Sequence, residues 1–265
     1  MSKKSHIKGR GAQQKSHNRF FEMRHEERDD FKEYRFRESE DTTIRTRYID
    51  TFPKTIVNKV TSPDVGMEYS LNPYQGCEHG CVYCYARNSH EYWGYGAGID
   101  FESTIIIKRN APQLLEKKLR SNSWKAAPIV LSGNTDCYQP IEQKLKITRA
   151  LLSIFLKYKH PVAMITKNAL VQRDLDIITE LGKDNLFRIM ISITSLSEDT
   201  RRMLEPRTAS IRKRLQTVER LTQAGVPVGV MVAPIIPGIN SHEILPIIKE
   251  VSTRGALDIG HTIVR

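Results

Sequence analysis

The stretch from Asn72 to Arg87 reads NPYQGCEHGCVYCYAR and places Cys77, Cys81 and Cys84 within eight residues. Thiolates this close along a chain can converge on one soft metal centre, because a tight loop brings the three sulfurs together. Glycines next to the cysteines permit the sharp turns that such a loop needs. Three protein thiolates leave one iron of a four-iron, four-sulfur cluster without a protein ligand, and a small molecule can bind there.

The alternative is a zinc knuckle completed by His79 or His90, since three thiolates and one imidazole make a tetrahedral zinc site. Zinc sites usually pair one C-x2-C with a second, distant pair, and the sequence has no second pair. With zinc, the chain would be a non-catalytic basic protein that binds nucleic acid. Inert buried thiols are a further alternative, and they are the default interpretation of Cys137, which stands alone.

The composition limits the class of protein. A chain of 265 residues with a hydrophobic fraction of 39% can form one large domain. The net charge of +11 favours anionic partners such as nucleic acid, although a surface kept basic for solubility is an equal alternative. Three of the four cysteines are clustered, which argues against a disulfide framework. With no signal peptide and no long apolar run, we expect a cytoplasmic protein without membrane contact.

Residues 1–54 differ in composition from the rest of the chain. A polar, basic opening is followed by a mixed-charge stretch, and neither can bury enough apolar area to offset the entropy of ordering. We therefore expect residues 1–54 to form a disordered N-terminal extension, either a nucleic-acid contact or a solvated tail, before a core domain over 55–265. The basic residues of its first part are Lys3, Lys4, Lys8, Arg10, Lys15, Arg19 and Arg24.

From about residue 55 onward, short apolar runs alternate with helical patterns. The runs predict strands near 69–72, 129–132, 162–165, 188–193, 228–233 and 258–264. Helical periodicity predicts helices over 143–158, 170–181, 211–224 and 241–253. About six such units imply a parallel sheet covered by helices, as a doubly wound sheet or as a barrel. The absence of a G-x-G-x-x-G fingerprint weakens the dinucleotide-binding option.

The cysteine spacing resembles the signature of the radical S-adenosylmethionine (AdoMet) enzymes, in which an aromatic residue, here Tyr83, precedes the last cysteine. Further stretches are similar to the branch grouped with spore photolyase, the DNA-repair enzyme. They are SGNTDCYQPIE, ITKNALVQRDLD, ISITSLSEDTRRMLEPR and GVPVGVMVAPIIPGIN, and the likeness covers about residues 55–265. It implies a partial six-stranded (β/α) barrel with the cluster loop after its first strand. The chain stops at Arg265, on or just after the sixth strand, so we expect a C-terminal truncation.

The resemblance also implies the chemistry. Cys77, Cys81 and Cys84 would hold a 4Fe–4S cluster, and AdoMet would chelate its open iron. Reduction of AdoMet then yields a 5′-deoxyadenosyl radical that abstracts a hydrogen atom from substrate. A flavodoxin- or ferredoxin-type electron donor is required. The substrate is unidentified, nucleic acid is one candidate, and no catalytic residue is assigned.

Six residues are expected to bind AdoMet: Tyr83, Asn134, Asp136, Ser192, Arg207 and Ala233. By the resemblance, Tyr83 lies beside the adenine, and Asn134 or Asp136 accepts the methionine amino group. Ser192 touches the ribose or the carboxylate, Arg207 suits a carboxylate or phosphate, and Ala233 lies in an apolar wall for the adenine. Each residue has a structural alternative: aromatic packing, a turn or helix cap, a satisfied strand end, or a surface ion pair.

Overall fold

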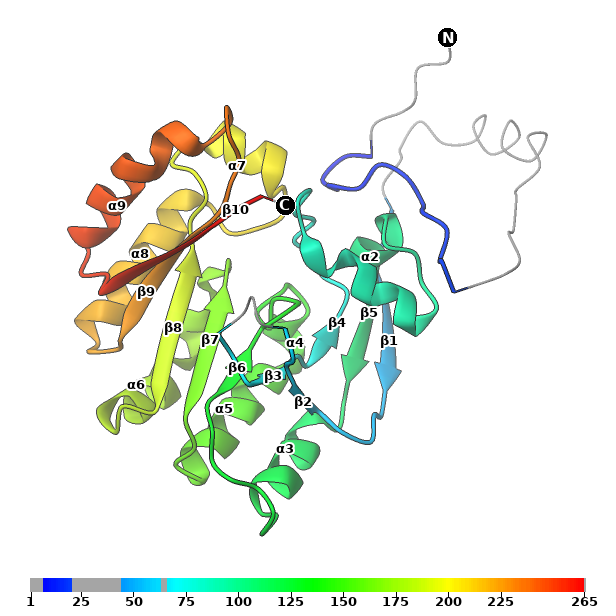
Figure 1. Cartoon of the computed structure of the whole chain (residues 1–265), viewed down its shortest axis with the longest axis vertical. Coiled ribbons are helices and arrows are strands. Elements are labelled where there is room, and N and C mark those ends of the chain that lie inside the picture. The colour runs from blue at the N-terminus through cyan, green and yellow to red at the C-terminus, as the bar shows by residue number, and fades with distance from the viewer. Residues whose placement is uncertain (1–6, 21–43, 63–65, 265) are drawn as a thin grey trace.

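The computed structural model describes residues 7–20, 44–62 and 66–264. Its strands form two sheets (Figure 1). The larger sheet has the order β10-β9-β8-β7-β6-β3-β2 and the smaller one the order β1-β5-β4. The strands of the larger sheet are β2 (Val57–Lys59), β3 (Tyr69–Leu71), β6 (Ile129–Leu131), β7 (Val162–Thr166), β8 (Phe187–Ser192), β9 (Val228–Ile235) and β10 (Asp258–Ile263). Those of the smaller sheet are β1 (Arg47–Thr51), β4 (Tyr74–Gln75) and β5 (Thr104–Lys108).

Six neighbouring strands of the larger sheet, from β3 to β10, run parallel, and β2 joins their edge antiparallel to β3. Each parallel pair is separated in sequence by helical segments, because a parallel connection has to return the chain to the end of the sheet where the first strand began. This arrangement confirms the expected partial (β/α) barrel.

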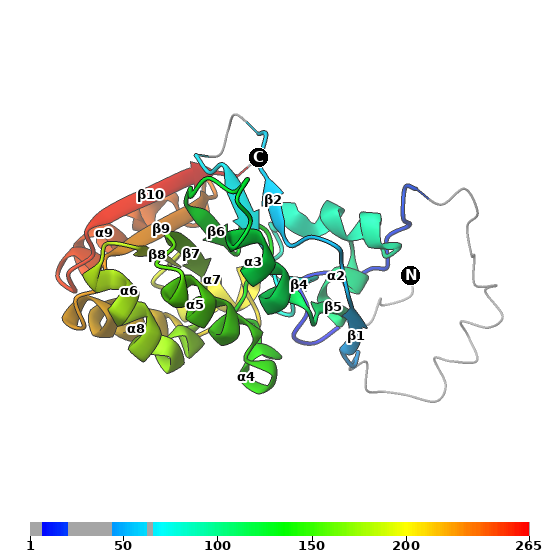
Figure 2. The ribbon, with the colours of Figure 1, turned by 90° about the horizontal axis from the view of Figure 1, so that it is seen from below.

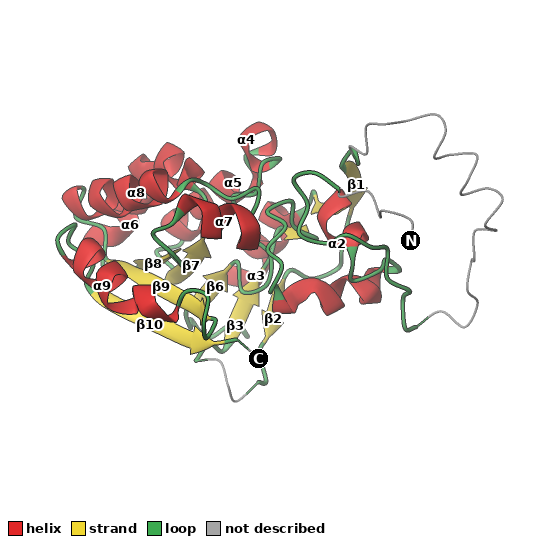
Figure 3. Ribbon diagram, turned by 90° about the horizontal axis from the view of Figure 1, so that it is seen from above, coloured by secondary structure: helices red, strands yellow, loops and turns green. Residues whose placement is uncertain are grey.

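Helices cover one face of the parallel sheet (Figures 2 and 3). In chain order the helices, with 3-10 helices labelled η, are η1 (Tyr85–Trp93), α2 (Ile99–Ser103), α3 (Ala111–Leu119), α4 (Glu142–Leu145), α5 (Ile147–Lys157), η2 (Ala169–Asp174), α6 (Leu175–Lys183), α7 (Glu198–Leu204), α8 (Ile211–Gln223), η3 (Ser241–Glu243) and α9 (Ile244–Ser252). Fully buried side chains such as Phe155 of α5 and Leu181 of α6 belong to the same core as Met164 and Ile189 of the strands. Each such side chain contributes about 1.5–3 kcal/mol by leaving water.

Three predicted helices differ in detail from the observed ones. The helix expected over 143–158 is two helices, because Lys146 takes a left-handed conformation with φ 54° between α4 and α5. The helices expected over 170–181 and 241–253 each begin with a 3-10 segment, η2 and η3. Helices α3 and α7 and the whole smaller sheet were outside the prediction. Within the described residues, no helix is long and apolar enough to cross a membrane.

Parts of the expected N-terminal extension have defined places in the structure. β1 pairs in parallel with β5, from Arg47 opposite Thr104 to Thr51 opposite Lys108. Residues 10–18 also contact the core, and Arg10 and Asn18 are each only 6% exposed. The expectation of a solvated tail is therefore wrong for these segments, while residues 1–6 and 21–43 lie outside the described ones. A domain boundary between residues 54 and 55 stays a prediction.

Candidate functional site

The cysteine loop, residues 76–84, leaves β4 and contacts the segments that follow three parallel strands. His79 joins it to them. Its Nδ1 lies 3.4 Å from a carboxylate oxygen of Asp136, after β6, and its Nε2 lies 3.4 Å from Nδ2 of Asn168, after β7. Its carbonyl accepts a 3.2 Å hydrogen bond from the backbone N–H of Arg207, beyond β8. The loop therefore lies at the carboxyl end of the parallel sheet, where barrels of this kind place their chemistry.

The start of the loop is fixed by the segment that contains α2. The backbone N–H of Cys77 donates a 2.8 Å hydrogen bond to the carbonyl of Phe101. Gly76 has a φ of 80°, and a Cβ at this position would lie 2.7 Å from the carbonyl oxygen of Thr104. A side chain here would push the loop away from α2, so glycine is required on both counts.

The three thiols of the loop are free. Cys77 is buried, and Cys81 and Cys84 are half-buried. Burial raises the pKa of all three, that of Cys77 to about 12, whereas the nearby Lys167 ammonium pulls the pKa of Cys81 and Cys84 down. Among the described residues, no set of three or more His, Cys, Asp or Glu side chains is arranged so that it could hold a metal ion. Three thiols from one loop are nevertheless the donor set of an iron–sulfur cluster with one open iron.

A buried ion pair lies beside the loop. Glu205 is fully buried; it accepts hydrogen bonds from the Tyr83 hydroxyl, from Thr194 at 3.0 Å and from Arg214 at 2.5 Å. Burial alone would raise the pKa of Glu205, but Arg214 and Lys167 outweigh it and lower this pKa to about 2. Glu205 is therefore ionised, and it holds the Tyr83 hydroxyl next to the cysteines.

Ser192, at the end of β8, has a buried hydroxyl without a partner. The residue is 1% exposed, and its Oγ makes no hydrogen bond in the structure. The backbone carbonyl of the same residue accepts a 2.9 Å hydrogen bond from Arg214, which connects it to the Glu205 pair. A buried polar atom with no partner is costly unless a ligand completes it, so this hydroxyl fits the expected role in binding AdoMet.

Asp136 and Asn134 are placed differently from each other. Both carboxylate oxygens of Asp136 are engaged: Oδ1 accepts from the N–H of Tyr138 at 2.9 Å and Oδ2 from that of Lys167 at 2.8 Å. The hydroxyl of Thr166 also donates to Asp136, at 2.8 Å. Asn134 is exposed, and its backbone N–H donates to the side-chain oxygen of Asn72, just after β3. Asp136 therefore holds the segment after β6 against the end of β7. Its contact with AdoMet stays a prediction.

The remaining predicted residues have separate surroundings. Tyr83 has the Lys167 ammonium 5.9 Å from its ring centroid, so the two lie together at the strand ends. Ala233 is half-buried near the end of β9. Arg207 instead lies 3.5 Å from a carboxylate oxygen of Glu78. This contact agrees with the structural alternative for Arg207, an ion pair within the protein.

The sequence does not predict the role of two groups at this site, Arg214 and Glu205. Arg214 lies in the first turn of helix α8, and its position in the sequence, among Arg212, Lys213 and Arg220, suggests one of several surface cations. Glu205 immediately precedes Pro206 and Arg207 in the sequence. A glutamate before proline, after a predicted strand, is the only sequence signal for Glu205, and it does not identify Arg214 as its buried partner.

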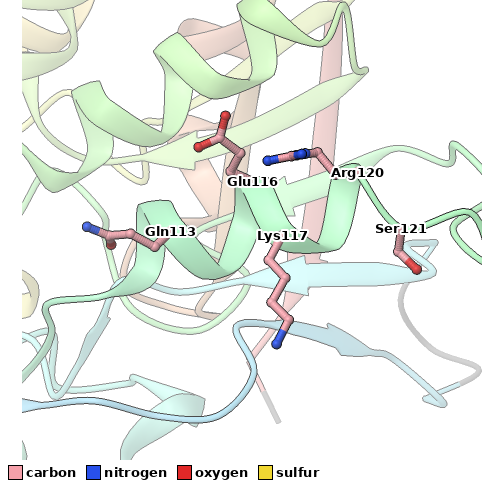
Figure 4. Close-up of a pocket in the computed structure, with 5 residues that line it drawn as sticks. All are labelled: Gln113, Glu116, Lys117, Arg120 and Ser121. Carbon is pink, nitrogen blue, oxygen red and sulfur yellow. The ribbon is translucent and has the colours of Figure 1, made fainter.

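The pocket drawn in Figure 4 lies elsewhere. Its lining comes from α3 and the turn that follows it: Gln113, Glu116, Lys117, Arg120 and Ser121. Helix α3 precedes β6 and lies at the lower end of Figure 1, whereas β7 and β8 point upward, toward the level of α2 and α7. No predicted site residue lines this pocket.

Comparison with known proteins gives one family. Residues 71–251 match the model of the Radical SAM superfamily. An uncharacterised protein of Mycobacterium tuberculosis is 31% identical over 188 residues, which cover 71% of this chain and 55% of that protein. A radical SAM Nα-GlyT isomerase of Pseudomonas phage M6 is 24% identical over 173 residues, or 64% of this chain and 34% of that one.

Among solved structures, a spore photoproduct lyase variant with bound AdoMet and dinucleoside spore photoproduct is similar to this chain. The TM-score is 0.60 at 18% identity, over 82% of this chain and 62% of that chain. At this level of identity the likeness is one of fold. The chain spans 55% of the length of the mycobacterial relative and 62% of that of the lyase.

Proposed function

Because the chain belongs to the radical SAM superfamily, whose members use AdoMet, we propose that it holds a 4Fe–4S cluster through Cys77, Cys81 and Cys84. In this proposal AdoMet binds at the open iron. The observation that carries the proposal is the position of the cysteine loop, which contacts the segments after β6, β7 and β8 at the carboxyl end of the parallel sheet. When bound, the two cofactors supply a 5′-deoxyadenosyl radical for hydrogen abstraction from a substrate.

The residues around the loop have separate roles in this proposal. Ser192 offers an unsatisfied buried hydroxyl to AdoMet. Glu205 orients Tyr83 toward the expected position of the adenine, and Arg214 keeps Glu205 ionised. Lys167 contributes a positive charge near the thiols, which favours thiolates and an anionic cofactor group.

The test is the conversion of AdoMet to 5′-deoxyadenosine by anaerobically reconstituted, reduced protein. We expect a brown protein with broad absorption near ~400 nm and about four irons per chain. Cys81→Ala should abolish both the iron and the product, since each thiolate binds its own iron. Cys137→Ala is the matched control, because Cys137 is fully buried in the hydrophobic core and should leave the cluster intact.

Two results would count against this function. A colourless protein with one zinc per chain would favour the alternative of a non-catalytic zinc protein. Full iron loading in any single alanine variant of the triad would show that the three cysteines are not the ligands.

Nucleic acid is the substrate class that we propose to test first. The net charge of +11 suits a polyanion, and the structurally similar lyase variant carries a bound dinucleoside spore photoproduct. The proposal includes a reducing, cytoplasmic setting and a flavodoxin- or ferredoxin-type electron donor, because the expected cluster has to be reduced before it can act.

A further inference from the structure

Residues 10–18 lie against the cysteine loop and the α2 segment, far from them in sequence (Figure 1). The N-terminal segment comes very close to the cysteine loop at Gly11. A Cβ at Gly11 would lie 2.0 Å from the carbonyl oxygen of Gly80 and 3.1 Å from a side-chain carbon of Val82. Backbone meets backbone here, in the middle of the cysteine loop, so any side chain at Gly11 would separate the two segments.

The far end of this segment is fixed by polar contacts with η1 and the turn after it. The backbone N–H of Ile99 donates a 3.0 Å hydrogen bond to the carbonyl of Gln14, and that of Gly98 donates to the Ser16 hydroxyl at 2.7 Å. Asn18 is buried, and its side-chain amide donates to the carbonyl of Glu91 at 2.8 Å. These contacts use specific groups and bury the Asn18 side chain, which is not the behaviour of a solvated tail.

Arg10 is the most constrained side chain of the segment. It is 6% exposed, and its guanidinium donates to the carbonyl of Glu102 at 2.5 Å. It also donates to the carbonyl of Ile44 and to the hydroxyl of Thr46, each at 2.9 Å. A planar guanidinium presents five N–H donors in fixed directions, whereas a lysine ammonium presents three that rotate about one point.

Two chains of contacts lead from residues 10–18 to the cysteine loop. In the first, the fully buried Glu102 carboxylate accepts from the N–H of Ala12 at 2.7 Å and from Arg87 at 2.6 Å. Arg87 in turn donates to the carbonyl of Cys81 at 2.8 Å. Glu102 therefore couples the N-terminal segment to the residue that holds a cysteine carbonyl.

The second chain of contacts reaches the other half of the loop. The Thr46 hydroxyl accepts from Arg10 and donates to a carboxylate oxygen of Glu78 at 2.8 Å. The second carboxylate oxygen of Glu78 accepts from the Tyr48 hydroxyl at 3.0 Å. Glu78 immediately follows the first cysteine and is 2% exposed, so this contact fixes the loop between Cys77 and Cys81.

We propose that residues 10–18 form a strap that positions the cysteine loop and closes one side of it against solvent, with Arg10 as its positioning residue. The proposal rests on the proposed function only in that it treats the three thiols as ligands. The strap acts through Glu102 and Arg87 on one half of the loop and through Thr46 and Glu78 on the other. Arg10 touches no cofactor in this scheme.

The test is the rate at which a maleimide alkylates the thiols of the metal-free, full-length protein, followed cysteine by cysteine by mass spectrometry. Arg10→Ala and Gly11→Val should each speed alkylation of Cys81 and Cys84 about tenfold or more, since loss of charge-assisted bonds or a steric wedge opens the loop locally. Lys8→Ala removes the same charge from an exposed neighbouring position and should leave the rates unchanged. Because no metal is present, failure of the proposed function would not affect this result.

Cys137, which is fully buried and away from the strap, reports whether a variant has merely unfolded. Unchanged rates at the loop cysteines in both Arg10→Ala and Gly11→Val would overturn the proposal, and so would equal acceleration at Cys137. Asn18→Ala removes one of the contacts at the far end of the strap and should give a smaller increase at the loop cysteines. In reconstituted protein, the strap variants should also lose their absorption near ~400 nm faster in air than the Lys8 variant does.

Discussion

Ser192 has a hydroxyl that should weaken the ligand-free fold and strengthen AdoMet binding. A buried polar group without a partner costs about 1–3 kcal/mol. Ser192→Ala should therefore raise the free energy of unfolding of ligand-free protein by about 1 kcal/mol, measured by urea denaturation. The same change should weaken AdoMet binding to the reconstituted protein about tenfold, measured by equilibrium dialysis. Ser153→Ala, at an exposed position of α5, should change neither quantity. An unchanged AdoMet affinity in Ser192→Ala would show that Ser192 does not bind AdoMet.

His90 should make the stability of the fold depend on pH. Its ring is fully buried, neither ring nitrogen has a partner, and burial lowers its pKa from 6.5 to about 4. The unfolded chain then binds the proton more tightly than the folded one, so stability is lost as pH falls from about 6.5 to about 4. The full effect is on the order of 3 kcal/mol.

His90→Phe keeps a ring against Phe101, whose centroid lies 5.6 Å away, and removes the titrating group. The difference in unfolding free energy between this variant and the natural chain should grow in favour of the variant below pH ~6.5. Urea denaturation at pH ~7.5 and ~4.5 measures it. A difference that stays constant between the two pH values would contradict the lowered pKa.

Individual residues of the site differed in how well the sequence could predict them. The cysteine triad is contiguous, so its spacing alone predicts a metal loop. Glu205 is 122 residues from Tyr83, and only the fold shows that the two meet. Arg207 was a reasonable choice for an anion ligand, but Glu78, a loop residue with no assigned role, lies beside it. Contacts between distant segments depend on tertiary packing, and residue types and their local spacing do not predict it.

At the level of elements, the break between α4 and α5 should be a removable weakness. Lys146 is exposed and adopts φ 54°, a conformation that costs an L-residue about 1 kcal/mol relative to glycine. Lys146→Gly should therefore raise the free energy of unfolding by about 0.5–1 kcal/mol. Lys144→Gly, two residues earlier within α4, should lower it by a similar amount, because glycine is a poor residue inside a helix. Thermal denaturation of both variants compares them, and a loss of stability in both would refute the argument.

Most strands of the parallel sheet are predictable because they are short apolar runs with buried residues, whereas β10 at the edge has no fully buried residue. The run at 162–165, for example, became β7, Val162–Thr166. The smaller sheet was harder. β1 exposes or half-exposes every residue and is a strand only because it pairs with β5, 57 residues later. Helix α3 carries only two buried residues, Ala111 and Leu115, so its periodicity is weak.

At the scale of the whole molecule, the charge of +11 should appear as salt-dependent binding to nucleic acid. Each phosphate contact adds roughly 0.7–0.9 to the slope of log affinity against log salt. Lys8 and Lys15 are exposed, so replacing both with alanine should reduce this slope. Arg10 is buried and fully occupied by the protein, so Arg10→Ala should leave the slope unchanged. This corrects the sequence-based expectation that counted Arg10 among the phosphate contacts.

Fluorescence anisotropy with single-stranded DNA and RNA, titrated with salt, measures the slope. We expect little preference for sequence, because contacts to phosphates do not distinguish bases. Lys3, Lys4 and Arg24 lie outside the described residues, and a variant without these charges shows whether they contribute. Absence of binding at low ionic strength would remove nucleic acid as the first substrate class to test.

The N-terminal strap has a consequence for how the protein is made. Arg10 leaves the ribosome before the carbonyl that it binds, which belongs to Glu102, 92 residues later in the chain. At a synthesis rate of about 5–20 residues per second, the strap waits roughly 5–20 s for its partner. Cys77, Cys81 and Cys84 are translated within that interval, so a nascent chain presents all three thiols before the strap can close over them. Delivery of iron and sulfide during synthesis would therefore meet a loop without the strap, whereas delivery to the finished protein would meet a loop that the strap closes on one side.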